Sequence, residues 1–184
     1  MISHLAIQNF KRFSATELRL CPLTVLTGLN GTGKSTAIQA LLLARQACGA
    51  GGSVVQLNGP DGLALGEAFD VLHPEAADQR IFIEVTDGDV TYEYVFGIPD
   101  GRALNLEVLQ SPHQAPPVLG DTGTRFTYLS AERLGPRDQL DVTGVEGADV
   151  GVGAQGQYTA QLLALRETEE VREPLRHADT PTTT

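Results

Sequence analysis

Alternating hydrophobic and polar positions predict β-structure at the start of the chain. Leu5 and Ile7 alternate with polar neighbours, and Leu18 and Leu20 repeat this pattern. The run 23–27 is compact and largely apolar, which is typical of a strand buried within a sheet. We therefore expect β-structure over the first thirty residues.

A helix is predicted after this β-structure, from about Ser35 to Cys48. Its residues are mostly good helix formers, and Gly49 is suited to end it. Because apolar residues nearly encircle the helix, we expect it to be buried against a sheet. The glycine-rich residues 49–66 are predicted to form a loop.

A hairpin and a third strand are predicted further along the chain. Hydrophobic positions alternate with polar ones over 81–85 and again over 90–96, and Asp87-Gly88 supplies a turn between them. After a second turn, the pattern over 104–108 predicts another antiparallel strand. The three strands would form a β-meander.

The remaining patterns bear on domain organisation. Residues 111–123 are rich in proline and glycine and are predicted to be a connection, followed by a strand over 126–130 and a helix over 157–173. A chain of 184 residues that is 41% hydrophobic fits one globular domain with a real core. We therefore expect a single lobe over 1–176 and a flexible polar tail over 177–184.

The candidate chemistry lies in the sequence Gly-Leu-Asn-Gly-Thr-Gly-Lys-Ser at 28–35, hereafter the glycine loop. Glycines let successive backbone N–H groups turn towards phosphates, and a following helix adds its positive N-terminal end. Lys34 is predicted to reach the β and γ phosphates of ATP as the catalytic lysine, and Ser35 to ligate Mg²⁺. The predicted nucleotide-binding residues of this motif are Gly28, Asn30, Gly31, Thr32, Gly33, Lys34, Ser35 and Thr36 (at the α phosphate).

Residues 7–13 and 20–36 together resemble the opening of the RecF, SMC and OLD-like ATPases, which belong to the ABC class of P-loop proteins. The resemblance is specific over 2–44. It implies an α/β fold, a P-loop NTPase lobe with an antiparallel β-meander. It also implies that Asn30 approaches the γ phosphate and that Arg12 lies near the nucleotide. Proteins of this family close two heads into a dimer and act on DNA in repair or in defence against phage.

The sequence departs from this family in ways that concern hydrolysis. The family's second lobe carries an apolar strand ending in Asp-Glu, a signature segment and a switch histidine, and none of these is found here. The stretch 81–84 ends in a single carboxylate and fits a strand of the meander better, while 129–133 lacks the signature glycines. Gln155 or Gln157 is a candidate for the glutamine that helps to hold Mg²⁺. We therefore expect ATP binding with negligible hydrolysis by the chain alone, and either a second ATPase lobe or a homodimer as partner.

The net charge and hydropathy of the chain limit which partners and which cellular location we expect. The formal net charge of -10 argues against a general electrostatic grip on nucleic acid, so any contact with DNA would be local. No stretch approaches the length of an apolar membrane helix and no leader pattern precedes the fold, so we expect a cytoplasmic protein. Cys21 and Cys48 are expected to be buried free thiols.

Three alternative functions remain open at this point. The first is a free-standing P-loop phosphotransferase, although no arginine-rich lid over the loop is evident. The second is an ABC transporter-type ATPase, in which an aromatic residue ahead of the loop stacks on the base; Phe10 or Phe13 could be confused with that residue. The third is a non-catalytic nucleotide-binding module.

Overall fold

The structure is a computed structural model. Its described residues are 1–49, 53–59, 62–120, 126–132, 135, 138–144, 151–171 and 173. The chain divides into two compact units, Met1–Asp121 and Thr122–Thr184, and each is described by itself. The expectation of one lobe over 1–176 stays a prediction, and the expected tail over 177–184 lies outside the described residues.

The first unit is built on a six-stranded antiparallel sheet of order β2-β1-β6-β7-β8-β3. The β-structure predicted around Leu5, Ile7 and Leu18 and the predicted meander are confirmed. Gly88, with φ 66°, forms the turn between the two longest strands of the meander. The strands are β1 (Ile2–Phe10), β2 (Phe13–Arg19), β3 (Val54–Gln56), β6 (Arg80–Asp87), β7 (Val90–Gly97) and β8 (Asn105–Gln110).

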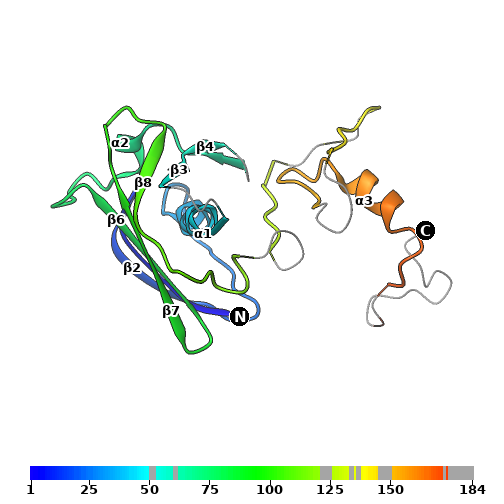
Figure 1. Ribbon diagram of the computed structural model, residues 1–184, viewed down its shortest axis with the longest axis horizontal. Helices are drawn as coiled ribbons and strands as arrows, with labels where there is room; N and C mark the ends of the chain where they lie inside the picture. Colours follow the sequence, from blue (N-terminus) through cyan, green and yellow to red (C-terminus); the bar gives the residue numbers. More distant parts are fainter. Residues whose placement is uncertain are drawn as a thin grey trace. The chain divides into compact units, whose positions relative to one another are not determined.

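Helix α1 (Lys34–Gly49) lies against the concave face of this sheet (Figure 1). The predicted helix and its burial are confirmed, because Leu42, Leu43 and Ala44 are all fully buried. Ile38 is an exception and is 41% exposed. Each large side chain that is removed from water in this layer stabilises the fold by about 1.5–3 kcal/mol.

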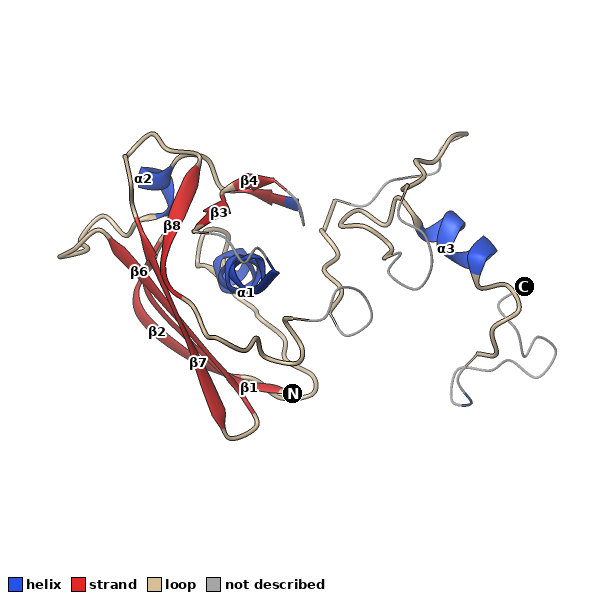
Figure 2. Cartoon of the chain, in the orientation of Figure 1, coloured by secondary structure: helices blue, strands red, loops and turns tan. Residues whose placement is uncertain are grey.

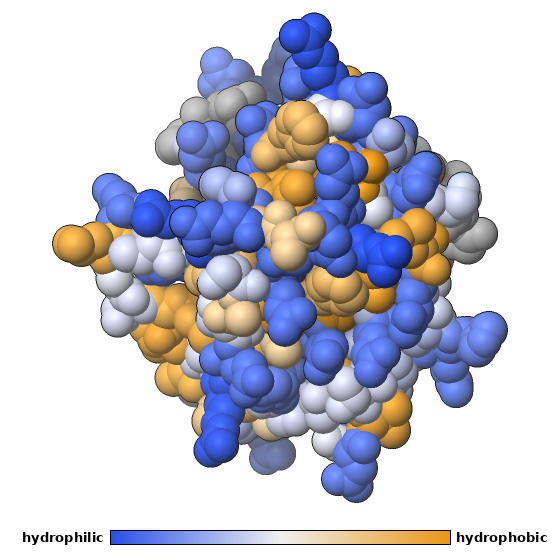
Figure 3. Space-filling view, turned by 90° about the vertical axis from the view of Figure 1, so that its left-hand side faces the viewer, coloured by the Kyte–Doolittle hydropathy of each residue, from blue (hydrophilic) through white to orange (hydrophobic). Residues whose placement is uncertain are grey.

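The two faces of the sheet differ in the way that strand alternation requires. Ile81 and Ile83 of β6 are buried on the side of α1, while Phe82 between them is only half-buried and Glu84 is exposed. The side of the sheet away from α1 is mainly hydrophilic, with hydrophobic side chains scattered among polar ones (Figure 3). Within the described residues of the first unit, α1 therefore covers one face of the sheet and leaves the other open.

The predicted loop over 49–66 contains short strands that sequence patterns miss. β3 pairs with β8, while β4 (Asn58–Gly59) and β5 (Leu63–Ala64) form a small separate sheet. Each strand is only two or three residues long, which is too short for an alternating pattern to be recognised. A one-turn helix, α2 (Ala68–Val71), follows.

The buried strand predicted over 23–27 is wrong. This segment, hereafter the exposed segment, is a loop between β2 and α1 (Figure 2). Leu23 is 82% exposed and Val25 is 72% exposed. No residue of the described chain forms a backbone hydrogen bond with Leu23 or with residues 25–27. An apolar run becomes a buried strand only where neighbouring strands pair with it, and the sheet described here ends at β2.

Two further expectations are corrected in part. Cys21 is exposed rather than buried. Cys48 is half-buried, and its Sγ lies 2.9 Å from the hydroxyl of Tyr94. Burial raises the pKa of the Cys48 thiol, and the hydrogen bond to Tyr94 opposes this rise to a smaller degree.

The second unit has little regular structure among its described residues. Helix α3 (Thr159–Leu165) is shorter than the predicted helix over 157–173, because the closely spaced carboxylates after Arg166 repel one another in a helix. The strand predicted over 126–130 is not found, because these residues belong to no helix or strand. In the parts of the chain described here, no helix combines the length and apolarity needed to span a bilayer.

Candidate functional site

The glycine loop leads directly into the first turn of α1. Gly28, Gly31 and Gly33 have φ angles of 149°, 79° and 100°, which are left-handed values. Residues with a Cβ rarely adopt such angles. The N–H of Ala37 donates to the Gly33 carbonyl oxygen at 3.1 Å, so the first helical hydrogen bond closes onto the last glycine. The unpaired N–H groups at the start of the helix therefore lie beside the loop.

Lys34 is tied to the loop that precedes it. Its Nζ donates to the carbonyl oxygens of Gly28 at 2.8 Å and of Leu29 at 2.7 Å. An ammonium group has three N–H bonds, so one of them is left for a ligand. This arrangement closes the loop and holds one positive charge at the start of α1, where an anion is favoured.

The tip of the glycine loop is stabilised by its own hydrogen bonds. The Thr32 hydroxyl donates to the Leu29 carbonyl oxygen at 2.9 Å, and the Thr32 N–H donates to the same oxygen at 3.4 Å. Residues 28–32 are exposed, whereas Gly33 is buried. The predicted phosphate contacts of Asn30 and Thr32 stay predictions, and both residues lie on this open tip.

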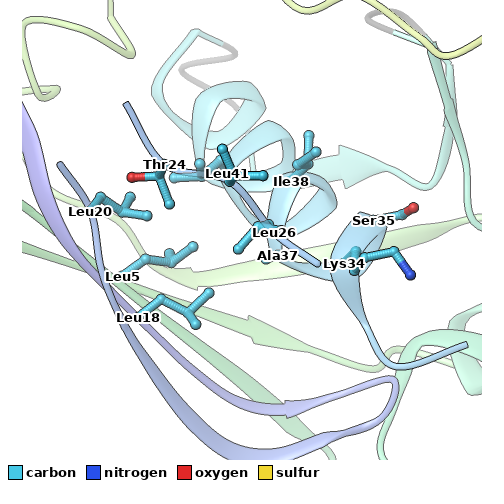
Figure 4. Close-up of a pocket in the computed structure, with 11 residues that line it drawn as sticks. Leu5, Leu18, Leu20, Thr24, Leu26, Lys34, Ser35, Ala37, Ile38 and Leu41 are labelled. Carbon is cyan, nitrogen blue, oxygen red and sulfur yellow. The ribbon is translucent and has the colours of Figure 1, made fainter. Parts of the chain in front are cut away.

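The two residues after Lys34 face different surroundings. Ser35 is exposed beside Lys34 at the start of the helix (Figure 4). Thr36 is only 7% exposed. The position of Ser35 leaves its hydroxyl accessible to a metal ion, while the Thr36 hydroxyl is largely shielded. Their predicted roles, at Mg²⁺ and at the α phosphate, are not tested by this geometry.

The turn between β1 and β2 brings Arg12 to the glycine loop. A Cβ placed on Gly31 would lie 3.5 Å from the Nη1 atom of Arg12. The Arg12 side chain forms no ion pair with a described carboxylate. Its guanidinium group therefore lies beside the place that a side chain at Gly31 would occupy, and its predicted role near the nucleotide stays a prediction.

A comparison with protein families finds a match in the first half of the chain, which contains the glycine loop. A family model described as an AAA ATPase domain matches residues 1–99 and includes the whole glycine loop. The chain belongs to the AAA ATPase domain family. Among curated proteins, none gives a significant match. Membership supports ATP binding and an ATPase function in general, and it implies the use of a nucleotide and usually of Mg²⁺.

One contact of this AAA ATPase domain is not evident from the sequence. The ring of Phe13 lies against the backbone of Gly33, and a Cβ there would lie only 2.6 Å from its Cζ atom. Phe13 stands twenty positions before Gly33, so no local spacing links the two residues. The nearest signal in the sequence is Phe13 itself, an aromatic residue ahead of the loop that can be confused with a base-stacking residue.

An apolar hollow flanks the glycine loop of the AAA ATPase domain. It has a volume of about 470 Å³ and lies between β1, β2, the exposed segment and α1. Leu5 and Leu18 face Leu26 and Leu41 across it, and Lys34 lies at one end (Figure 4). The hollow adjoins the site but offers few polar groups, so it is not suited to a phosphate chain.

In the described residues of the AAA ATPase domain, no carboxylate forms an ion pair or hydrogen bond with the glycine loop. Glu84 is exposed on β6, directly opposite Glu93 of β7, so 81–84 is a strand of the meander as expected. Lys34 bonds only to carbonyl oxygens. In the described ranges, no three His, Cys, Asp or Glu side chains are grouped as a metal site.

The candidate residues of the second unit are not brought into a site. Gln157 accepts a hydrogen bond from the Gln155 N–H at 3.0 Å, within a turn before α3. In 129–133, the Ser130 N–H donates to the Ala154 carbonyl oxygen at 2.7 Å. Arg133 lies outside the described residues. The role of either glutamine at Mg²⁺ stays a prediction.

Proposed function

We propose that this chain binds ATP with Mg²⁺ at the glycine loop. The observation that carries the proposal is the loop geometry: three left-handed glycines, a lysine bonded to two loop carbonyls, and a helix that starts at that lysine. Lys34 would donate its remaining N–H to the β and γ phosphates, and the exposed Ser35 hydroxyl would ligate Mg²⁺. Arg12 would neutralise further phosphate charge from the side of Gly31.

Hydrolysis by the chain alone is expected to be negligible. Phosphoryl transfer to water needs a group that orients the attacking molecule, in addition to a loop and a metal that position the phosphates. No carboxylate or histidine of the described residues hydrogen-bonds with the glycine loop. We therefore propose an ATP-binding lobe whose catalytic groups come from elsewhere.

We further propose that the lobe belongs to a RecF/OLD-like ATPase and works with a second ATPase lobe or a second copy. The resemblance over 7–13 and 20–36 supports the subclass. The exposed segment supports a lobe that works with a partner, because its apolar side chains and unpaired backbone are suited to a neighbouring strand. The completed assembly would act on DNA in repair or in defence against phage.

Calorimetric titration of the full chain with ATP and Mg²⁺ tests the nucleotide proposal. Lys34→Ala should abolish measurable binding, because it removes both the phosphate donor and the two bonds that close the loop. Arg19→Ala on β2 is the matched control for the loss of one positive charge, and it should bind as the wild type does. Both variants should melt within a few degrees of the wild type, since surface substitutions change stability by about 0.5 kcal/mol or less. Equal affinity of the wild type and Lys34→Ala would refute the assignment.

A further inference from the structure

Two side chains of the β1–β2 turn meet two glycines of the glycine loop. Arg12 approaches Gly31, and the ring of Phe13 approaches Gly33. A Cβ built on Gly33 would lie 2.6 Å from the Cζ atom of Phe13 and 2.7 Å from its Cε1 atom, which is closer than real Cβ atoms approach other atoms. The ring therefore occupies the space that the absence of a side chain at Gly33 leaves open.

The turn that carries Phe13 is held in an unusual backbone conformation. Asn9 and Lys11 have φ angles of 58° and 51°, which cost a residue with a Cβ on the order of 1–3 kcal/mol. Contacts from residues distant in sequence maintain it. The Lys11 N–H donates to the Val71 carbonyl oxygen at 2.8 Å, and the His73 N–H donates to the Asn9 carbonyl oxygen at 3.0 Å.

Side chains fix the same turn to the sheet and to the helix that carries the loop. The Asn9 Nδ2 donates to the Arg80 carbonyl oxygen at 3.1 Å, and the Lys11 Nζ donates to Gln39 Oε1 of α1 at 3.1 Å. Burial lowers the pKa of Lys11, while the nearby charge of Asp70 opposes this. The turn is thus joined to the sheet through Asn9 and to α1 through Lys11.

The glycine loop itself has few such constraints. Among the described residues, and apart from the helical bond at Gly33, its hydrogen bonds join Leu29 to Thr32 and Lys34 to two loop carbonyls, all within the loop. A loop with so few outside contacts samples several conformations, of which only some point their N–H groups at a phosphate chain. We infer that Phe13 is a positioning residue, whose ring holds Gly33 so that the loop stays in its phosphate-binding conformation; this rests on the proposed function.

The test compares the full-length wild type with Phe13→Ala, Phe13→Leu and a control, Phe82→Ala. Phe82 is also half-buried but lies on the sheet face away from α1. Amide hydrogen exchange of residues 28–35 is measured without nucleotide, and Mg²⁺-ATP affinity is measured by calorimetry. Phe13→Ala should speed exchange in the loop and weaken ATP binding about tenfold, as for a competent population reduced to roughly a tenth. Phe13→Leu should restore part of both, and Phe82→Ala should change neither.

Each outcome decides between the possibilities. Unchanged loop exchange in Phe13→Ala would overturn the inference, whatever the ATP result. Faster exchange throughout the first unit, with an equal fall in Tm for Phe82→Ala, would also overturn it, because Phe13 would then be an ordinary packing residue. If the wild type bound no ATP while Phe13→Ala loosened only the loop, the proposed function would fail and the structural contact between Phe13 and Gly33 would stand.

Discussion

Substitution of Gly33 by alanine separates the geometry of the glycine loop from the stability of the fold. At φ 100° an alanine is strained, at a cost of about 1–3 kcal/mol. Its Cβ would also lie 2.6 Å from the Phe13 ring, and displacing a packed side chain costs about 1–3 kcal/mol more. The loop is exposed up to Thr32, so we expect it to relieve this strain by rearranging rather than by unfolding the sheet.

The expected result of Gly33→Ala is a loss of affinity without a comparable loss of stability. The two penalties together come to at least about 2 kcal/mol on the binding-competent loop, which weakens ATP binding at least roughly 30-fold. Gly88→Ala is the matched control, since Gly88 also has a left-handed φ, of 66°, but nothing lies within 4 Å of its missing Cβ. That variant should lose about 1–2 kcal/mol of unfolding free energy and keep its affinity for ATP.

Calorimetry with Mg²⁺-ATP and urea unfolding measure the two quantities on the same preparations. The double variant Gly33→Ala with Phe13→Ala removes the clash and leaves the backbone strain, so it should bind no more tightly than Phe13→Ala alone. Wild-type affinity in Gly33→Ala would refute the reasoning, because the loop would then bind ATP in a conformation other than this one. Equal loss of affinity in Gly88→Ala would refute it as well.

Three further experiments with substituted chains test separate parts of the structure. Ser35→Ala should lose most of the affinity that Mg²⁺ adds to ATP binding and keep the metal-free affinity. Calorimetry with and without Mg²⁺ measures both affinities, and an unchanged gain in ATP affinity on adding Mg²⁺ would contradict the assignment. In Cys48→Ser, the exposed Cys21 is the one thiol that a maleimide can modify, and in Cys21→Ser it is Cys48. At pH 8 Cys21 should react at least about tenfold faster than Cys48, because burial raises the pKa of Cys48. Leu23→Ser with Val25→Ser should reduce binding of an apolar dye and leave unfolding free energy within about 0.5 kcal/mol; a large destabilisation would show that the segment is buried.

The glycine loop could be predicted from sequence because its determinants are contiguous. The three glycines, Lys34 and the helix that follows act within a stretch of eight residues and the first turn of α1. The meander was predictable for a similar reason, since each strand carries a regular alternation and Gly88 marks a turn. Patterns of this kind depend on neighbours along the chain, which the sequence displays directly.

The contact between Phe13 and Gly33 could not be predicted in that way. It depends on the left-handed turn at Lys11, which depends in turn on the Val71 carbonyl oxygen some sixty residues later. A lysine at such a φ angle is contrary to local preference, so local rules favour a different turn. Only the folded sheet, with α1 and the residues near Val71 in place, makes that conformation the stable one.

The error over the exposed segment has a different cause and leads to a consequence for the site. The apolar composition of a segment indicates that it is suited to pack against other apolar groups. It does not indicate whether a neighbouring strand that carries such groups is present. Because the segment runs straight into Gly28, a strand that paired with it would also restrict the loop backbone. If one of these ligands has already ordered the loop, the other loses less conformational entropy when it binds. Such a partner and ATP should therefore bind with positive coupling. Linkage makes the effect reciprocal: ATP would strengthen the partner's binding by the same factor.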